Sequence, residues 1–301
     1  MTRKAGQVLV TGATGFLGSA VVAHLRAAGR PICATVRETG ASAGTGTVAV
    51  GDLNGETDWT TALAGVDAVV HCAARAHVLK ETAADPLAQF RRVNTEGALA
   101  LARQAAASGV RRLIFISSIG VNGAETRGTP FSANDAPRPH SPYAQSKHEA
   151  EQGLAAIATN TGMEVVVIRP PLITGPDPKG NLGTLARFIS LGLPLPFGLV
   201  TRNRRDLVSR ETLCRLIGTC LDHPAAPGRT FLVSDGAPIS TRHLLETLAA
   251  DMGRRLRLLP VPPILLAVAL DALGRSAMRS QLLADLEVDI GPTCETLGWR
   301  P

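Results

Sequence analysis

The chain of 301 residues is poor in aromatic side chains: Phe, Trp and Tyr make up 3% of it, and there is a single tyrosine. Its core must therefore be filled by aliphatic residues, and 45% of the sequence is hydrophobic. Close-packed layers of helix and sheet are built from such residues. This composition favours an α/β protein with a substantial core and argues against a disordered chain.

Cysteine is scarce, and its spacing indicates no paired use. The five cysteines are an odd number, and none stands in a CxxC pair. The sequence therefore predicts neither a disulfide framework nor a zinc site, and no metal is expected. Reduced thiols in the cytoplasm are the simpler interpretation.

Long apolar runs are also missing: none reaches the roughly 20 residues that a span of the bilayer takes. The start, MTRKAGQVLVTG, leads directly into a strand pattern without the apolar region of a signal peptide. We therefore expect a cytoplasmic protein without stable membrane insertion. The most apolar stretch, Val261 to Leu273, contains two prolines and one aspartate. It predicts a buried or interface helix, with docking on a membrane surface as the lesser alternative.

The charge balance is basic but diffuse. Lys and Arg number 31 against 25 acidic residues, which gives a net charge of +6. The arginines are scattered along the chain and no aromatic residues interleave with them, so nucleic acid is not an expected partner. An anionic small molecule fits this balance equally well.

Short apolar strands alternate with helical patterns as far as residue 169. Strands are expected at 7–11, 32–36, 48–50, 68–71, 113–117 and 165–169, and helices at 16–28, 91–108 and 143–160. Such alternation predicts a doubly wound α/β fold, in which helices cover both faces of a parallel sheet. Prolines and glycines cluster after Arg169. We therefore expect a first domain at 1–170 and a smaller mixed α/β region at 171–301, with segments such as 206–235 returning to the first.

A strand-turn-helix junction near the N-terminus carries three glycines spaced three apart. In VLVTGATGFLG the glycines allow a tight turn, and backbone N–H groups at the helix start can approach a pyrophosphate. Because this turn follows the first strand of an alternating pattern, it predicts a Rossmann-type dinucleotide-binding domain. The residues expected at the cofactor are Gly12, Thr14, Gly15, Phe16, Leu17 and Gly18.

The second strand indicates which dinucleotide binds. An acidic residue at its end would hydrogen-bond the ribose of NAD, but Val36 and Arg37 stand there. The guanidinium of Arg37 can pair with a 2′-phosphate, so NADP(H) is favoured and NAD(H) is the alternative. The other interpretation of Arg37 is a solvated residue at a strand end.

Two later strand ends are also expected at the cofactor. Asp52 and Leu53 follow the third strand, where Asp52 faces the adenine amine or is a simple turn residue. Ala73 and Ala74 follow the fourth strand, where small side chains let the backbone pass beside the cofactor.

The single tyrosine, Tyr143, stands four residues before Lys147, one of only four lysines. On a helix the two side chains project from the same face. An ammonium group beside a phenol lowers the pKa of the phenol, which can then exchange a proton with a sugar or alcohol oxygen. Ser118, at the end of a strand, can donate a hydrogen bond to the same oxygen.

These motifs occur together along nearly the whole chain. They include TGATGFLG, HCAARAHV, NTEG, ISSIGVNG, YAQSK, RPPLITGP, NRRDLV and LGWRP. In these motifs and their order the chain resembles the extended short-chain dehydrogenase/reductases, in particular the NAD(P)-dependent nucleotide-sugar epimerase/dehydratase family. The resemblance implies that Ser118, Tyr143 and Lys147 are catalytic, that Asn94 supports the lysine through water, and that Pro170 lies at the cofactor.

For the substrate, the resemblance implies a UDP-sugar and a homodimeric enzyme. The implied substrate-binding residues are His77, Ser118, Asn181 and Arg205. Arg205 matches an arginine that pairs with the diphosphate through its guanidinium. A solvated basic turn is the other interpretation of Arg205 and its neighbour Arg204.

Departures from the family pattern narrow the reaction. Family dehydratases place Asp-Glu directly after the catalytic Ser or Thr, but this chain has Ile119 and Gly120 there, so dehydration lacks its acid and base. Where the family usually has Val-Tyr-Gly, this chain has Val121-Asn122-Gly123, so the tyrosine is replaced by Asn122.

With Arg37, these features favour NADPH-dependent reduction of a 4-keto nucleotide sugar, of the UDP-4-keto-6-deoxy-N-acetylhexosamine type, in surface polysaccharide synthesis. The alternative is an NAD-dependent UDP-sugar 4-epimerase similar to UDP-glucose 4-epimerases. The intact set of Ser118, Tyr143 and Lys147 disfavours a third hypothesis, an inactive NADP-sensing or scaffold protein on the same fold.

Overall fold

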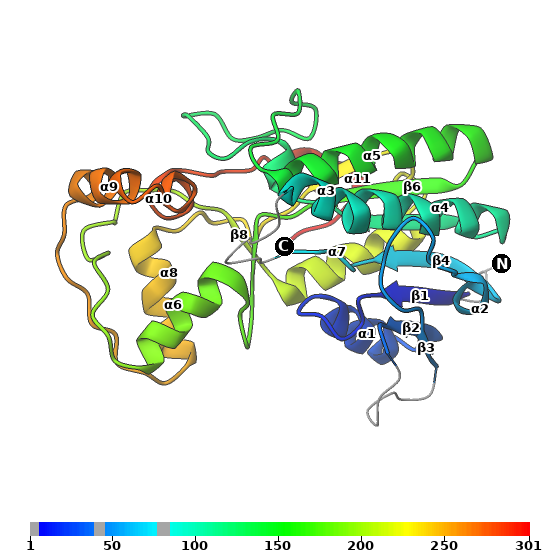
Figure 1. Cartoon of the computed structure of the whole chain (residues 1–301), viewed down its shortest axis with the longest axis horizontal. Helices are drawn as coiled ribbons and strands as arrows, with labels where there is room; N and C mark the ends of the chain where they lie inside the picture. The colour runs from blue at the N-terminus through cyan, green and yellow to red at the C-terminus, as the bar shows by residue number, and fades with distance from the viewer. Residues whose placement is uncertain (1–5, 39–45, 77–84) are drawn as a thin grey trace.

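The computed structural model describes residues 6–38, 46–76 and 85–301. Within these ranges seven parallel strands form one sheet, in the order β3-β2-β1-β4-β5-β6-β9 (Figure 1). The strands are β1 (Gln7–Thr11), β2 (Ile32–Val36), β3 (Thr47–Ala49), β4 (Val66–His71), β5 (Arg112–Ile116), β6 (Glu164–Arg169) and β9 (Thr230–Leu232).

The strands are rich in Val and Ile and are buried on both faces, as parallel strands require. On one face the core joins them to α1 (Gly18–Ala27), α7 (Arg210–Asp222) and α11 (Gly291–Leu297). On the other face it joins them to α2 (Thr60–Leu63), α4 (Gly97–Ala107) and α5 (Pro142–Thr161). The prediction of a Rossmann-type doubly wound α/β fold is confirmed.

The sheet has its switch point at β1. This strand pairs with both β2 and β4, so that Val10 lies opposite Ala34 on one side and Val70 on the other. The chain after β1 therefore leaves toward one side of the sheet, and the chain after β4 leaves toward the other. The crevice at the carboxyl ends of these two strands is where open α/β sheets bind ligands.

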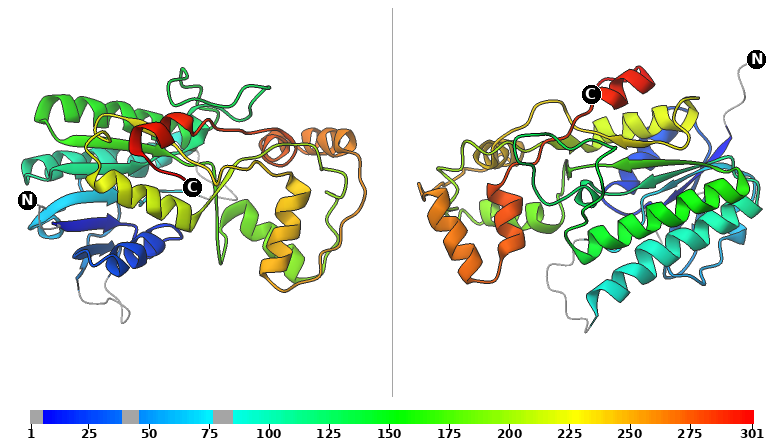
Figure 2. Two further views of the ribbon diagram at one scale, coloured as in Figure 1. Left: turned by 180° about the vertical axis from the view of Figure 1, so that it is seen from behind. Right: turned by 90° about the horizontal axis from the view of Figure 1, so that it is seen from above.

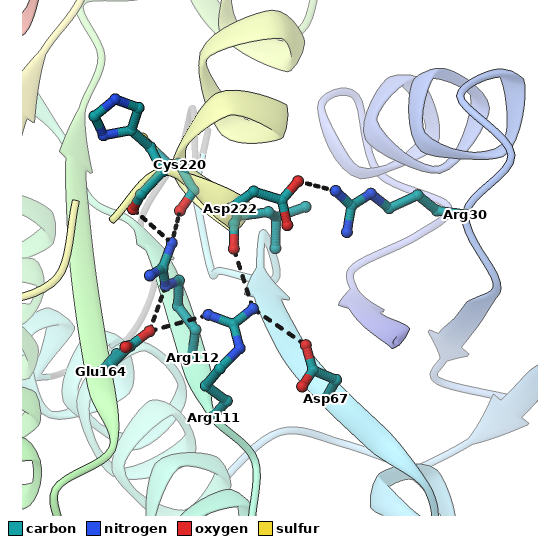
Figure 3. Close-up of polar contacts among 9 residues, drawn as sticks. Arg30, Asp67, Arg111, Arg112, Glu164, Cys220 and Asp222 are labelled. Carbon is teal, nitrogen blue, oxygen red and sulfur yellow. Dashed lines mark hydrogen bonds and ion pairs between the residues drawn. The ribbon is translucent and has the colours of Figure 1, made fainter. Parts of the chain in front are cut away.

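At the amino ends of the strands, a cluster of charged side chains joins the sheet to α7 (Figure 3). Arg112 donates to Glu164 at 2.7 Å and to the carbonyl of Cys220 at 2.6 Å. Arg111 donates to Asp67 at 3.1 Å and to Glu164 at 3.0 Å. Arginines that donate to the last carbonyls of a helix satisfy its C-terminus, so this cluster fixes α7 against the amino ends of β4, β5 and β6.

A smaller lobe lies beyond the carboxyl ends of the strands (Figures 1 and 2). Strands β7 (Leu172–Thr174) and β8 (Leu207–Ser209) pair near its base. The lobe has a core of its own, built by α6 (Gly180–Ser190), α8 (Thr241–Asp251), α9 (Pro263–Ala272) and α10 (Ser276–Leu283). In contrast, β9 comes from sequence beyond residue 171 and lies beside β6 in the main sheet.

Helix α9 corrects one expectation. The apolar stretch at 261–273 was expected to be buried or to form an interface, and burial is wrong because Leu266 is the only α9 residue that the fold buries. Ile264, Leu265 and Val268 point outward and are exposed. Among the described residues no helix has both the length and the apolar character to cross a membrane.

Candidate functional site

The glycine-rich turn between β1 and α1 has the shape of a phosphate cradle. Gly12 has a φ of +64°, and a Cβ there would lie 2.8 Å from Cα of Ala73. A Cβ on Gly18 would lie 2.1 Å from the carbonyl oxygen of Gly12. Thr14 and Gly15 are exposed at the tip of the turn, and α1 begins without a side-chain cap. The uncapped helix start beside exposed backbone fits the pyrophosphate of a dinucleotide.

At the end of β2, Arg37 and Asp52 form an ion pair. Nε of Arg37 lies 3.0 Å from Oδ1 of Asp52, and both side chains are largely exposed. The two residues expected at the adenosine half of the cofactor are therefore neighbours, and Asp52 offsets part of the charge offered to a 2′-phosphate. Leu53 is partly buried against the core beneath them.

At the carboxyl end of β4, the chain passes close to the glycine turn. The N–H of Ala73 donates to Oγ1 of Thr11 at 3.2 Å, and Ala73 packs on Gly12. Ala74 is partly buried next to it. The small side chains expected here therefore allow the close approach. Burial raises the pKa of the Cys72 thiol to about 12, so this thiol stays protonated at neutral pH.

His71, the last residue of β4, is a buried imidazole that the sequence did not single out. Its Nδ1 is hydrogen-bonded to Oγ1 of Thr11 at 2.8 Å, and its ring stacks on Phe115. Among the described residues, its Nε2 has no hydrogen-bond partner. Burial, and secondarily the positive charge of Lys147, lowers the pKa of His71 to about 3. The ring is therefore neutral at physiological pH.

We expect His71 to make the chain sensitive to acid. Its pKa is about 3 when folded against 6.5 normally, so the unfolded chain binds a proton that the folded chain does not, and stability falls as the pH drops below 6.5. Between pH 7 and pH 5 the free energy of unfolding should fall by about 2 kcal/mol more in the wild type than in the His71→Phe variant. Urea unfolding at both pH values measures this difference, and parallel pH curves for the two proteins would contradict it.

The first turn of α5 brings Tyr143 and Lys147 together on one helix. Ser141 caps the helix, its hydroxyl accepting from the N–H of Ala144 at 3.2 Å, and Pro142 occupies the first position. Tyr143 is half-buried and makes an edge contact with Phe90. Lys147 is fully buried, donates to the carbonyl of Ile116 at 2.9 Å and lies 4.5 Å from the ring centre of Phe115. The predicted shared helix is therefore present.

The pKa values of Tyr143 and Lys147 differ from what their spacing predicted. Burial raises the pKa of the Tyr143 phenol to about 12, whereas proximity to Lys147 was expected to lower it. The ammonium of Lys147 is held instead by the Ile116 carbonyl, and burial lowers its own pKa to about 8, partly offset by Cys72 and Glu151. The chain by itself thus keeps Tyr143 protonated at neutral pH.

Ser118 lies at the start of a short 3₁₀ turn, η2 (Ile119–Val121), against the first turn of α5. Its hydroxyl accepts from the N–H of Gly120 at 3.1 Å. A Cβ placed on Gly120 would lie 3.2 Å from Oγ of Ser118 and 3.3 Å from Cβ of Ala144. Ser118 is therefore next to the helix turn that carries Tyr143, and the packing leaves little room for a side chain at position 120.

Asn94 is buried in the π-helical segment η1 (Arg91–Glu96), which follows α3 (Pro86–Phe90). Its side chain accepts from the N–H of Arg75 at 2.8 Å and donates to that residue's carbonyl and to Oγ of Ser146, both at 3.1 Å. Asn94 thus ties the segment after β4 to the residue beside Lys147. Its support of Lys147 through water stays a prediction. π-Helical turns inside helices are frequent at functional sites.

Two predicted substrate residues meet at α10, which the sequence did not indicate. Arg205 is buried, its Nη1 donates to the carbonyls of Ser280 and Ala284 at 3.0 and 2.8 Å, and burial lowers its pKa to about 10. The alternative of a solvated turn is therefore wrong for Arg205. Asn181 donates to Oε1 of Gln281. Both contacts hold the side chains against α10, and the roles of Arg205 and Asn181 in binding the substrate stay predictions.

A buried charged network behind Ser118 also escaped the sequence reasoning. Arg169, at the end of β6, donates to both carboxylate oxygens of Glu151 at 2.9 and 2.6 Å. Oγ of Ser117 donates to Glu151 at 2.5 Å, and Arg169 also donates to Asn122 at 2.9 Å. Next along the chain, Pro170 accepts from the N–H of Ile119 at 3.0 Å. The only sequence signal was a glutamate four residues after Lys147.

Other predictions concern residues outside these clusters. His77 lies outside the described residues, so its role at the sugar stays a prediction. All five cysteines are free in the structure. Within the described part of the chain no group of His, Cys, Asp and Glu side chains is arranged to hold a metal ion.

Comparisons with known proteins identify the family of the chain. Residues 8–234 match the family described as NAD dependent epimerase/dehydratase. A UDP-glucose 4-epimerase from Vibrio cholerae is 44% identical over 296 residues, covering 98% of this chain and 90% of that protein.

Two solved structures share the fold. MoeE5 in complex with UDP-glucose and NAD has a TM-score of 0.78 at 24% identity, covering 98% of this chain and 93% of that one. UDP-glucose 4-epimerase from Thermotoga maritima with UDP-glucose has a TM-score of 0.75 at 21% identity, covering 98% and 93%. The resemblance drawn from the motifs is confirmed, and the chain belongs to the NAD dependent epimerase/dehydratase family.

Proposed function

We propose that the protein is a UDP-sugar 4-epimerase that uses a nicotinamide dinucleotide. The observation that carries this proposal is the 44% identity, over 98% of the chain, to a protein named UDP-glucose 4-epimerase. The cradle at Gly12 to Gly18 and the placement of Tyr143 and Lys147 on one helix, with Ser118 beside its first turn, support it. The finer expectation of a 4-keto reductase thus becomes the second candidate.

In this function the chain's own residues move a proton at the sugar C4 oxygen. The bound dinucleotide supplies the acceptor and donor of the hydride. Tyr143 would act as its phenolate, which would take the hydroxyl proton when the sugar is oxidised to a 4-keto sugar and return it when the keto group is reduced from the other face. Because the chain by itself keeps this phenol protonated, the positive charges of Lys147 and of the oxidised dinucleotide would have to lower its pKa. Ser118 donates a hydrogen bond to the same oxygen, and Lys147 places a positive charge beneath the site. No hydride or proton is consumed over the full cycle.

Dehydration does not fit the packing around η2. A dehydratase needs an acid and a base directly after the catalytic serine. Here Ile119 is buried in an apolar cluster, and a side chain at Gly120 would crowd Ser118 and Ala144. The two positions therefore serve packing, and we do not expect loss of water from the sugar.

Reduction of a 4-keto UDP-sugar is the second candidate because of Arg37. Its position at the end of β2 favours NADP(H), a cofactor that a reductase takes up and releases in each turnover. Asp52 pairs with Arg37 at 3.0 Å and weakens that preference. The cytoplasmic location and the homodimer expected from the resemblance stay predictions under either candidate.

Arg37 makes the cofactor preference testable. If it binds a 2′-phosphate, Arg37→Ala should raise the dissociation constant for NADPH roughly tenfold or more and leave that for NADH nearly unchanged, because a charge-assisted hydrogen bond is lost. Fluorescence titration with both cofactors measures this, with Arg26→Ala on α1 as the control. Equal shifts for NADPH and NADH would show that Arg37 is a solvated strand-end residue.

A single experiment separates the two candidate functions. The nucleotide carried by the purified protein is released by denaturation and identified, and the native protein is assayed with UDP-glucose without added cofactor. Stoichiometric NAD with formation of UDP-galactose supports the epimerase. A protein that lacks bound nucleotide, ignores UDP-glucose and oxidises NADPH only with a 4-keto UDP-sugar would replace the proposal with the reductase.

A further inference from the structure

Apart from Asp271, helix α9 consists of apolar residues, but the fold covers it on one side only. Leu266 packs into the core of the smaller lobe, whereas Ile264, Leu265 and Val268 are 77%, 60% and 62% exposed. Ile264 and Val268 are four residues apart and share the outward face. A helix that is apolar all round is normally buried on all sides. The outward face of α9 is therefore left open by the part of the chain that the structure describes.

Two loops of the same lobe also expose apolar side chains. The N–H of Leu195 donates to the carbonyl of Arg257, and the N–H of Leu259 donates to that of Leu195, both at 2.9 Å. Both views in Figure 2 place this end of the smaller lobe away from the sheet. We use the term distal face for its exposed apolar residues: Leu193, Leu199, Leu259, Ile264, Leu265 and Val268.

Three exposed arginines stand close to Leu259 in the sequence. Arg254, Arg255 and Arg257 lie in the segment that leads from α8 into α9, and the exposed Asp251 precedes them. The acidic residue within α9, Asp271, pairs with Arg279 of α10 at 3.1 Å. The segment from Asp251 to Leu259 therefore carries an excess of positive charge beside the Leu259 part of the distal face.

We propose that the distal face docks reversibly on the surface of an anionic phospholipid bilayer. Its apolar side chains would enter the boundary between headgroups and acyl chains, and the three arginines would lie at the phosphates. The positive charge of their segment is what selects this occupant. In a two-fold dimer the same patch would face itself, and the arginines of one copy would approach those of the other.

Cosedimentation of the full chain with lipid vesicles tests this proposal without any measurement of activity. We expect binding to vesicles of phosphatidylglycerol and phosphatidylcholine, weaker binding to phosphatidylcholine alone, and a decrease as salt is raised. Arg254→Gln/Arg255→Gln/Arg257→Gln should lower the partition coefficient on anionic vesicles roughly a hundredfold, about fivefold for each arginine. Ile264→Ser/Leu265→Ser/Val268→Ser should lower it roughly tenfold or more.

The matched control removes the same charge from the larger lobe. Arg26→Gln/Arg103→Gln/Arg229→Gln changes three exposed arginines and should retain binding. If the two arginine variants lost vesicle binding equally, the net charge of the protein and not the distal face would explain the binding, and the proposal would be overturned. A lack of binding to anionic vesicles at low salt would also overturn it. Sedimentation velocity covers the remaining outcome: a dimer abolished by the serine substitutions, without vesicle binding, would identify a second copy as the occupant.

Discussion

Replacing Tyr143 with Phe should lower turnover about a thousandfold, within the 10² to 10⁴ range of a positioned proton-transfer group. The hydroxyl is the only group removed, and the ring keeps its edge contact with Phe90, at 6.0 Å between ring centres. Because no side-chain packing is removed with the hydroxyl, we expect the loss in kcat and not in the amount of folded protein. Steady-state assay with UDP-glucose, together with circular dichroism, measures both.

A nearby residue supplies the control for Tyr143. Gln145 lies two positions along α5, and its side chain donates to Glu149 at 3.0 Å, away from Lys147. Gln145→Ala should keep turnover close to that of the wild type. If Tyr143→Phe retains full turnover, another group transfers the proton, and the role assigned to the single tyrosine is wrong.

The residues that the sequence placed well share a local cause. The glycine turn and the spacing of Tyr143 and Lys147 depend on residues close together in the chain, so pattern and conformational preference determine them. The alternation of strands and helices likewise predicted the parallel sheet. The carboxyl ends of parallel strands meet at one side of the sheet, which brings Ser118 to the same side as the glycine turn.

The misplaced residues depend on packing between distant segments. The pKa of Tyr143 is governed by how deeply the phenol is buried, which spacing along a helix does not reveal. Arg205 donates to the carbonyls of Ser280 and Ala284, which are 75 and 79 positions away in the sequence. α9 resembled a core helix because composition reports that a segment is apolar but not which of its sides the fold covers. Local patterns carry no information on such pairings.

The pair of Glu151 and Arg169 should make the largest contribution to stability of any ion pair near the site. The side chains of Glu151 and Arg169 are 9% and 6% exposed, and the pair is bidentate at 2.9 and 2.6 Å. Arg169→Met leaves the carboxylate of Glu151 buried without its charge partner. We expect the free energy of unfolding to fall by about 3 to 5 kcal/mol, as measured by urea unfolding.

The double variant distinguishes a loss of charge pairing from a loss of packing. Glu151→Leu/Arg169→Met replaces both charges with apolar side chains, and it should recover more than half of the stability that Arg169→Met loses. On the surface, Arg242→Met breaks the exposed pair with Glu246 and should cost less than about 1 kcal/mol.

Because Ser117 donates to Glu151 at 2.5 Å, the double variant also frees the end of β5 next to Ser118. Its turnover should therefore stay low although its stability returns, since the buried pair holds the serine strand against α5. A double variant with both properties restored would limit the pair to a structural role.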